Sequence, residues 1–91
     1  MVEKKVHEEM VRELFALIVS LENIDDCRCL FEDLCTRKEV EQMAQRVRAA
    51  KLLLDGKTYQ QVMTETDISS ATLSRVSRCV QDGNGYKKLL G

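Results

Sequence analysis

Proline and tryptophan are missing from this 91-residue chain, and it contains only two phenylalanines and two tyrosines. The 44 % of residues that are hydrophobic are therefore mainly aliphatic, a composition that favours helices. Charged residues make up 32 % of the chain, which is typical of a folded globular protein and not of a disordered one. A chain of this length has a modest core, so we expect one domain over residues 1–91.

Long hydrophobic runs are also missing. No apolar stretch approaches the roughly 20 residues that a helix needs to cross a membrane. The acidic beginning of the sequence does not resemble a signal peptide. We therefore expect a cytoplasmic protein without a membrane partner.

Spacings and motifs typical of catalytic or metal sites are also missing. The chain has four cysteines and one histidine, His7. Cys27 and Cys29 lack the Cys-x2-Cys spacing of zinc sites, and on one helix their side chains would point about 200° apart. A cytosolic protein keeps such cysteines as thiols. No carboxylate pair, nucleophile motif or phosphate-binding glycine loop occurs. We therefore expect no metal, no cofactor and no enzymatic activity.

Charge is distributed unevenly along the sequence. Residues 1–35 contain four Lys/Arg and nine Asp/Glu, a balance of −5, whereas residues 36–91 contain ten and six, a balance of +4. A basic half can attract a polyanion such as a nucleic acid. The same charges would also suit an ordinary solvated surface, so this feature alone does not decide between the two.

Residues 3 to about 21 are predicted to form the first helix. Apolar residues recur there at helical spacing: Val6, Met10, Leu14, Leu17, Ile18 and Leu21. Val11 and Phe15 add a second apolar strip, so more than one side of this helix must be covered. It could be a core helix of a bundle, but a chain this short favours burial against a second subunit. We therefore expect a homodimer.

The next two helices are indicated by their capping residues. Asn23 or Asp25 can cap a short second helix. Thr36 and Glu39 have the spacing of a capping box and open a third, longer helix. Gly56 stands where a left-handed residue would end that helix.

A fourth and a fifth helix follow after a turn. Thr58 and Gln61 repeat the capping-box spacing, so the fourth helix begins near residue 59. Asp67 tolerates the turn conformation that ends it. Ser69 or Ser70 then caps a fifth helix that runs to about residue 80. A breaker-rich link leads to a short apolar tail, so the predicted fold is all-α with five to six helices.

Residues 59–80 have the pattern of a helix-turn-helix. The inner contacts would come from Val62, Ile68, Leu73 and Val76. The outer face of the second helix, about residues 70–80, would present Ser69, Ser70, Thr72, Ser74, Arg75 and Arg78. Serine and threonine can contact phosphates or base edges, and arginine can form a forked pair with guanine. Thr66 departs mildly from the pattern, since most such units have an aliphatic residue there. An ordinary helical hairpin would explain the same spacing.

Four motifs within residues 30–80 make a family resemblance specific. They are Thr36…Glu39, Arg46-Val47-Arg48, Leu53-Leu54-Asp55-Gly56 and Ala71-Thr72-Leu73-Ser74-Arg75. With these motifs the sequence resembles the tryptophan-repressor family, most closely its YerC/YecD group of Trp-repressor-like proteins. The resemblance implies an intertwined homodimer that presents two helix-turn-helix heads to a palindromic operator in double-stranded DNA.

The resemblance also points to a candidate effector pocket formed by Thr36, Arg46, Arg75, Val76 and Cys79. Arg46 and Arg75 align with arginines that flank the bound amino acid in tryptophan repressors, and Thr36 aligns with a residue at the same pocket. Val76 stands where those repressors have a glycine that leaves room for the indole. Cys79 replaces a serine near the amino group of the ligand. Control by tryptophan is therefore not expected, and any small-molecule effector stays unknown.

The function predicted from the sequence is that of a sequence-specific DNA-binding transcriptional regulator, in particular a repressor. The alternative is a helical protein–protein interaction module without DNA binding, whose apolar first helix docks on another protein. The basic second half of the chain favours the regulator.

Overall fold

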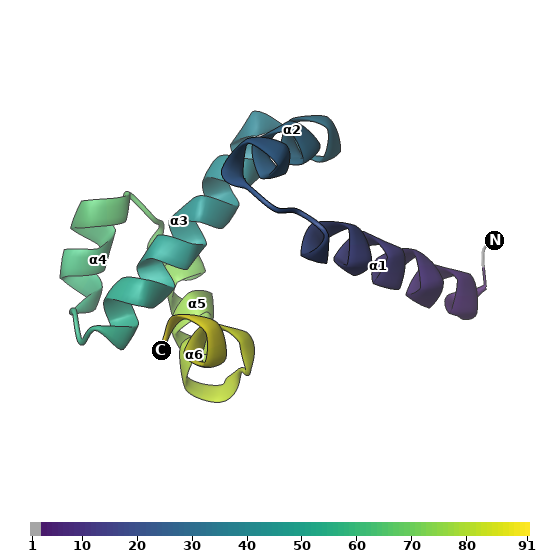
Figure 1. The fold of residues 1–91 in the computed structure, drawn as a ribbon. Coiled ribbons are helices and arrows are strands. Elements are labelled where there is room, and N and C mark those ends of the chain that lie inside the picture. Colours follow the sequence, from purple (N-terminus) through teal and green to yellow (C-terminus); the bar gives the residue numbers. More distant parts are fainter. Residues whose placement is uncertain (1–2) are drawn as a thin grey trace. The chain divides into compact units, whose positions relative to one another are not determined.

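Six α-helices and no strand make up the part of the chain, residues 3–91, that the computed structural model describes (Figure 1). The helices are α1 (Lys4–Val19), α2 (Ile24–Leu34), α3 (Arg37–Leu54), α4 (Tyr59–Thr66), α5 (Ser70–Asp82) and α6 (Gly85–Leu90). This confirms the predicted all-α fold. Among the described residues, no helix combines the length and the apolar character that a membrane span requires.

The chain divides into two compact units, one that ends at Thr36 and one that covers Arg37–Gly91. The first contains α1 and α2. The second contains α3 to α6 and has a core of its own. The boundary between the units is also where the net charge changes sign, from −5 to +4.

In the N-terminal unit, α2 begins after Asn23. The side-chain Oδ1 of Asn23 accepts a hydrogen bond from the backbone N–H of Asp26 at 2.8 Å. Asp25 and Asp26 lie in the first turn, where the helix dipole favours negative charge. Of the two caps that the sequence allowed, the structure therefore has Asn23.

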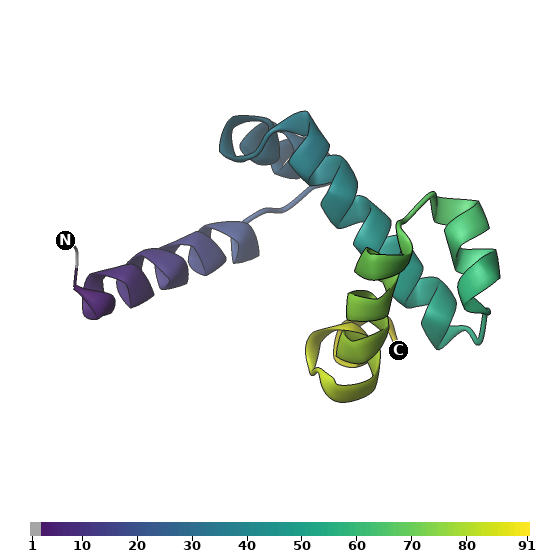
Figure 2. The same cartoon turned by 180° about the vertical axis from the view of Figure 1, so that it is seen from behind.

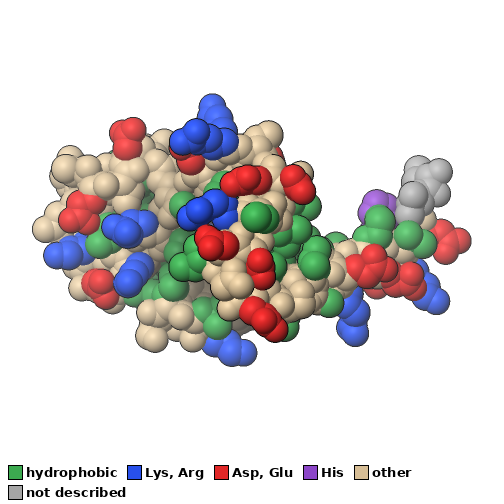
Figure 3. All heavy atoms as spheres, turned by 45° about the horizontal axis from the view of Figure 1, so that its top comes forward, with side chains coloured by type: hydrophobic (Ala, Val, Ile, Leu, Met, Phe, Trp, Pro, Cys, Tyr) green, Lys and Arg blue, Asp and Glu red, His purple; other side chains and the backbone are tan. Residues whose placement is uncertain are grey.

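Helix α1 buries none of its residues. Its apolar side chains reach the surface, as the hydrophobic side chains along α1 in Figure 3 show. Phe15 is 59 % exposed, and Met10, Val11 and Leu17 are each 48 % exposed. Apolar side chains on both strips that the sequence indicated are thus exposed, whereas Leu14 and Ile18 are half-buried.

In the C-terminal unit, α4, α5 and α6 all pack against the central helix α3 (Figures 1 and 2). Ala49 and Ala50 of α3 are both fully buried. Their small side chains let the neighbouring helices approach closely. The rest of the core consists of Val62 from α4, Ile68 from the turn, and Leu73, Val76 and Val80 from α5. These side chains hold α4 and α5 on α3 by burial of aliphatic surface.

The helix ends in this unit follow the local signals of the sequence. Gly56 has φ = 89° after the end of α3, a left-handed conformation that suits glycine. Thr58 caps α4: its Oγ1 accepts from the N–H of Gln61 at 3.2 Å, and the Gln61 side chain accepts from the N–H of Thr58 at 2.9 Å. This capping box was predicted and is confirmed. The corresponding box at Thr36 and Glu39 stays a prediction.

Residues 85–90 form a sixth helix where the sequence indicated a short apolar tail. Tyr86 and Leu90 of α6 pack against the core. A helix of six residues is unstable alone, because its few hydrogen bonds do not offset the conformational entropy that is lost when the first turn forms. Packing on α3 and α5 therefore stabilises it, and this packing could not be seen in the local pattern.

Candidate functional site

The turn between α4 and α5 is tight, and its residues take the places that the helix-turn-helix pattern predicted for them. Asp67 ends α4 in the left-handed conformation, with φ = 60° and ψ = 20°. Ile68 follows and is only 4 % exposed, so it fills the corner between the two helices. Ser69 then caps α5, since its Oγ accepts from the N–H of Thr72 at 3.2 Å. Each of these roles follows a prediction from the sequence.

The inner face of this unit is well packed. Val62, Leu73 and Val76 are its largest fully buried side chains. They come from both helices and, with Ile68, are the four inner contacts that the spacing predicted. Ser77 lies on the same side of α5 and is also buried, which sequence reasoning did not indicate. No buried side-chain polar atom of the described residues lacks a hydrogen-bond partner.

The outer face of α5 carries the predicted DNA-binding residues. Ser70, Ser74, Arg75 and Arg78 are exposed. Their side chains make no hydrogen bond or ion pair within residues 3–91. These hydroxyl and guanidinium groups are therefore available to an outside partner.

Ser69 and Thr72 are less available. The Ser69 hydroxyl donates to Oγ1 of Thr72 at 2.9 Å while it also accepts the capping bond, and Thr72 is half-buried. Both hydroxyls serve first to begin the helix. The O–H of Thr72 is still free to donate and can take part in a contact at the N-terminus of α5.

Sequence reasoning missed one polar residue that supports the turn. Gln45 of α3 is half-buried, and its Nε2 donates to the backbone carbonyl of Thr66 at 2.8 Å. A signal was present in the sequence, because Thr66 stands where an aliphatic residue is usual. It did not identify Gln45 as the partner, since the two residues lie 21 positions apart.

The residues of the candidate effector pocket lie in different environments. Arg46 on α3 is half-buried, whereas Arg75 and Cys79 on α5 are exposed. Val76 is 1 % exposed, so its branched side chain is already part of the core. Thr36 belongs to the N-terminal unit. The four cysteines are free thiols.

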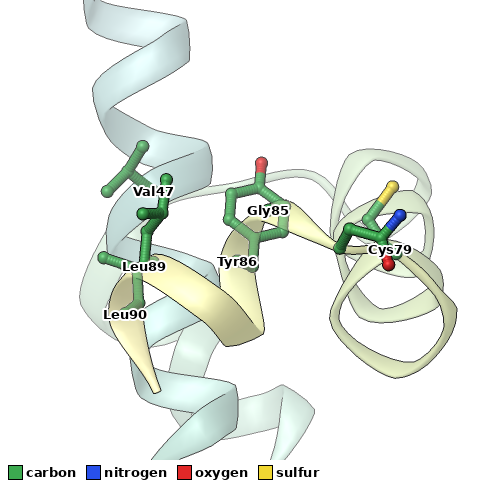
Figure 4. Close-up of a pocket in the computed structure, with 8 residues that line it drawn as sticks. Val47, Cys79, Gly85, Tyr86, Leu89 and Leu90 are labelled. Carbon is green, nitrogen blue, oxygen red and sulfur yellow. The ribbon is translucent and has the colours of Figure 1, made fainter.

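An apolar cleft lies beside this region, within the C-terminal unit. It has a volume of about 440 Å³ and is lined by Val47 of α3, Cys79 of α5 and, in and before α6, Gly83, Asn84, Gly85, Tyr86, Leu89 and Leu90 (Figure 4). Arg46, Arg75 and Val76 are not among its lining residues. Its lining is mostly apolar, which suits burial of aliphatic or aromatic surface more than binding of an anion.

Comparison with known proteins agrees with this architecture. The family described as "Trp repressor protein" matches residues 9–90. The uncharacterized protein YerC of Bacillus subtilis is 42 % identical over 80 residues, which cover 88 % of this chain and 77 % of YerC.

Two solved structures resemble the whole chain. A proposed Trp repressor from Staphylococcus aureus is 40 % identical and superposes with a TM-score of 0.89, over 99 % of this chain and 91 % of that one. A TrpR-like protein from Eubacterium eligens is 38 % identical with a TM-score of 0.88, over 96 % of this chain and 91 % of that one. Since the family match spans nearly all of the sequence and the fold matches along with it, this chain belongs to the Trp repressor family as a YerC-type, Trp-repressor-like protein.

Proposed function

We propose that this protein is a sequence-specific DNA-binding transcriptional regulator, a repressor that acts in the cytoplasm and reads its operator with α5. The observation that carries the proposal is the division of α5 into two faces. Leu73 and Val76 anchor one face in the core, while Ser70, Arg75 and Arg78 leave the other face open to a partner. A helix held rigidly on one side and polar on the other suits insertion into the major groove.

The open face offers both kinds of contact that DNA recognition needs. The guanidinium groups of Arg75 and Arg78 can bind phosphates or pair with guanine through two parallel hydrogen bonds. The hydroxyls of Ser70 and Ser74 can contact base edges or phosphates. The +4 balance of the C-terminal unit adds a long-range attraction for the DNA backbone.

We also infer that residues 1–91 act as one domain within a homodimer. Helix α1 buries nothing within its own chain and exposes Met10, Val11 and Phe15. A second copy would cover such a face and remove its apolar surface from water. Two copies related by a two-fold axis would present two α5 helices, and therefore match a palindromic operator with half-sites about one helical turn apart.

Tryptophan is not expected to be the effector. By the family resemblance, Val76 stands where tryptophan repressors have the glycine that leaves room for the indole, and its side chain packs in the same core as Val62 and Leu73. The valine can therefore hold α5 in place without a ligand. Within the C-terminal unit, Arg46, Arg75 and Cys79 would still allow a smaller effector, whose chemistry the residues do not specify.

The proposal can be tested by selecting sites from a library of random DNA duplexes. The wild type should enrich a palindrome, and binding should weaken steeply as salt rises, because phosphate contacts release counterions. The double variant Arg75→Ala/Arg78→Ala should lose at least tenfold in affinity for the selected site, by analogy with about 1–3 kcal/mol for one good base contact. Lys51→Ala/Lys88→Ala is the matched control, since both lysines are exposed and their loss removes the same charge from the same unit outside α5. Equal binding by the wild type and the arginine variant would exclude this use of α5.

The interaction module remains the second candidate, because the exposed apolar face of α1 would also suit another protein. It predicts no enrichment of any DNA sequence in the selection. The same experiment therefore separates the two functions.

A further inference from the structure

The turn of the helix-turn-helix is held by hydrogen bonds that converge on Thr66, the last residue of α4. Its Oγ1 donates to the carbonyl of Val62 at 2.7 Å and accepts from the N–H of Ile68 at 3.3 Å. Its backbone carbonyl accepts from Nε2 of Gln45 at 2.8 Å. A threonine at an otherwise aliphatic position is thereby explained, because its hydroxyl satisfies groups that the end of a helix leaves open.

The bond from Gln45 differs from the other two in what it connects. The bonds of the Thr66 hydroxyl are local and shape the turn itself. The Gln45 bond joins the turn to α3, across 21 positions of sequence. It is half-buried and lies within the C-terminal unit. It therefore fixes the position of the turn relative to α3, the central helix of the unit.

Aliphatic packing alone would leave the orientation of α5 less defined. Val62, Leu73 and Val76 are held to α3 by contacts that have no preferred direction. A hydrogen bond at 2.8 Å has a narrow range of distance and angle. Thr66 lies four positions before Ser70, so a shift of the turn moves the beginning of α5 with it. Contacts to base edges tolerate little such movement, since they too must be made at hydrogen-bond distance.

We propose that Gln45 is a positioning residue for DNA recognition, which fixes the turn through the carbonyl of Thr66 and so sets the orientation of α5 on α3. The inference rests on the proposed DNA-binding function and adds a residue that acts without touching the base edges. The bond is between neutral groups, so salt that screens the phosphate contacts leaves it largely intact. Gln45 thus contributes to discrimination between sites without adding a contact to the DNA.

The variant Gln45→Leu removes the donor and keeps a side chain of similar size. We expect its affinity for the duplex selected by the wild type to fall about tenfold, with affinity for a scrambled duplex of the same composition unchanged within twofold. Gln42→Leu is the matched control, because Gln42 lies on the same helix and is exposed. Gln42→Leu should bind both duplexes with the affinities of the wild type. The ratio of the two affinities is the decisive readout, because simple loss of folded protein lowers both equally.

A second measurement does not depend on the variant or on DNA. In the free wild type, the side-chain amide protons of Gln45 should exchange with water at least tenfold more slowly than those of Gln42, because only Gln45 donates to a half-buried carbonyl. Equal exchange rates would show that the bond is not maintained in solution and would overturn the inference, even if Gln45→Leu does not fold.

The outcomes separate the two proposals. A wild type that selects no duplex overturns the DNA-binding function, and the positioning role with it. A wild type that selects a duplex, together with a Gln45→Leu variant whose affinity ratio is unchanged or whose two affinities fall equally, overturns the positioning role alone.

Discussion

Replacing Val76 with glycine tests whether this side chain holds α5, the proposed DNA-reading helix, in place without an effector. The Val76 side chain is 1 % exposed, so all three of its carbons lie in the core. Their removal should cost about 2–3 kcal/mol at roughly 0.8 kcal/mol per buried carbon. Glycine within α5 should cost about 1 kcal/mol more. We therefore expect Val76→Gly to lower the free energy of unfolding by about 3–4 kcal/mol, measured by urea denaturation and circular dichroism.

The same change should open the slot that an indole needs. We expect Val76→Gly to gain binding of L-tryptophan, and the wild type to show none at micromolar concentration. Forcing an indole against Val76 would cost on the order of 1–3 kcal/mol in overpacking, about a tenfold to hundredfold loss of affinity. Tryptophan at 100 times its dissociation constant should raise the free energy of unfolding of the variant by about 2.7 kcal/mol. Titration calorimetry, with and without the selected duplex, measures the binding directly.

Val62→Gly is the matched control for this prediction. Val62 is also fully buried in the same core, but it lies on α4 and outside the candidate effector pocket. This variant should be destabilised to a similar degree and gain nothing from tryptophan. Micromolar binding of tryptophan by the wild type would refute the reasoning. An equal response of Val62→Gly and Val76→Gly would refute it as well.

Two further predictions concern assembly and local backbone. Sedimentation at micromolar concentration should give twice the 10.4 kDa mass of the chain. Phe15→Asp should shift it towards the monomer, whereas Ala16→Asp, at an exposed position on the polar side of α1, should not. A folded wild-type monomer would exclude the dimer. Gly56→Ala should lower the free energy of unfolding by about 1 kcal/mol, because an alanine is strained at φ = 89°. Gly85→Ala, where a Cβ meets equally open space in the first turn of α6, should instead raise it by up to about 1 kcal/mol; thermal or urea denaturation that finds the same sign for both would contradict this account.

Local features of this protein could be predicted from the sequence because their partners lie only a few residues apart. The cap by Ser69 and the capping box of Thr58 and Gln61 join residues three positions apart. The left-handed conformations at Gly56 and Asp67 depend on steric limits of single residues. The inner face of α5 follows from helical periodicity, which placed Leu73 and Val76 together. Spacing of this kind is sufficient to predict the helix ends, the turn between α4 and α5 and the outward residues of α5.

Other features were decided only by the tertiary structure, because they depend on contacts between residues that lie far apart in the sequence. The carbonyl of Thr66 could have accepted a hydrogen bond from water or from any donor nearby. Gln45 is the donor because α3 passes beside the turn in the folded unit. Residues 85–90 carry too weak a local preference to form a helix alone, and packing of Tyr86 and Leu90 on the core stabilises one. The cleft at Cys79 exists because α6 returns to α3, which no spacing within either helix could indicate. Local hydrogen bonds and steric limits act within about four residues. Burial of a side chain depends instead on which distant segment of the chain packs against it, and the packing is fixed only when the whole unit has folded.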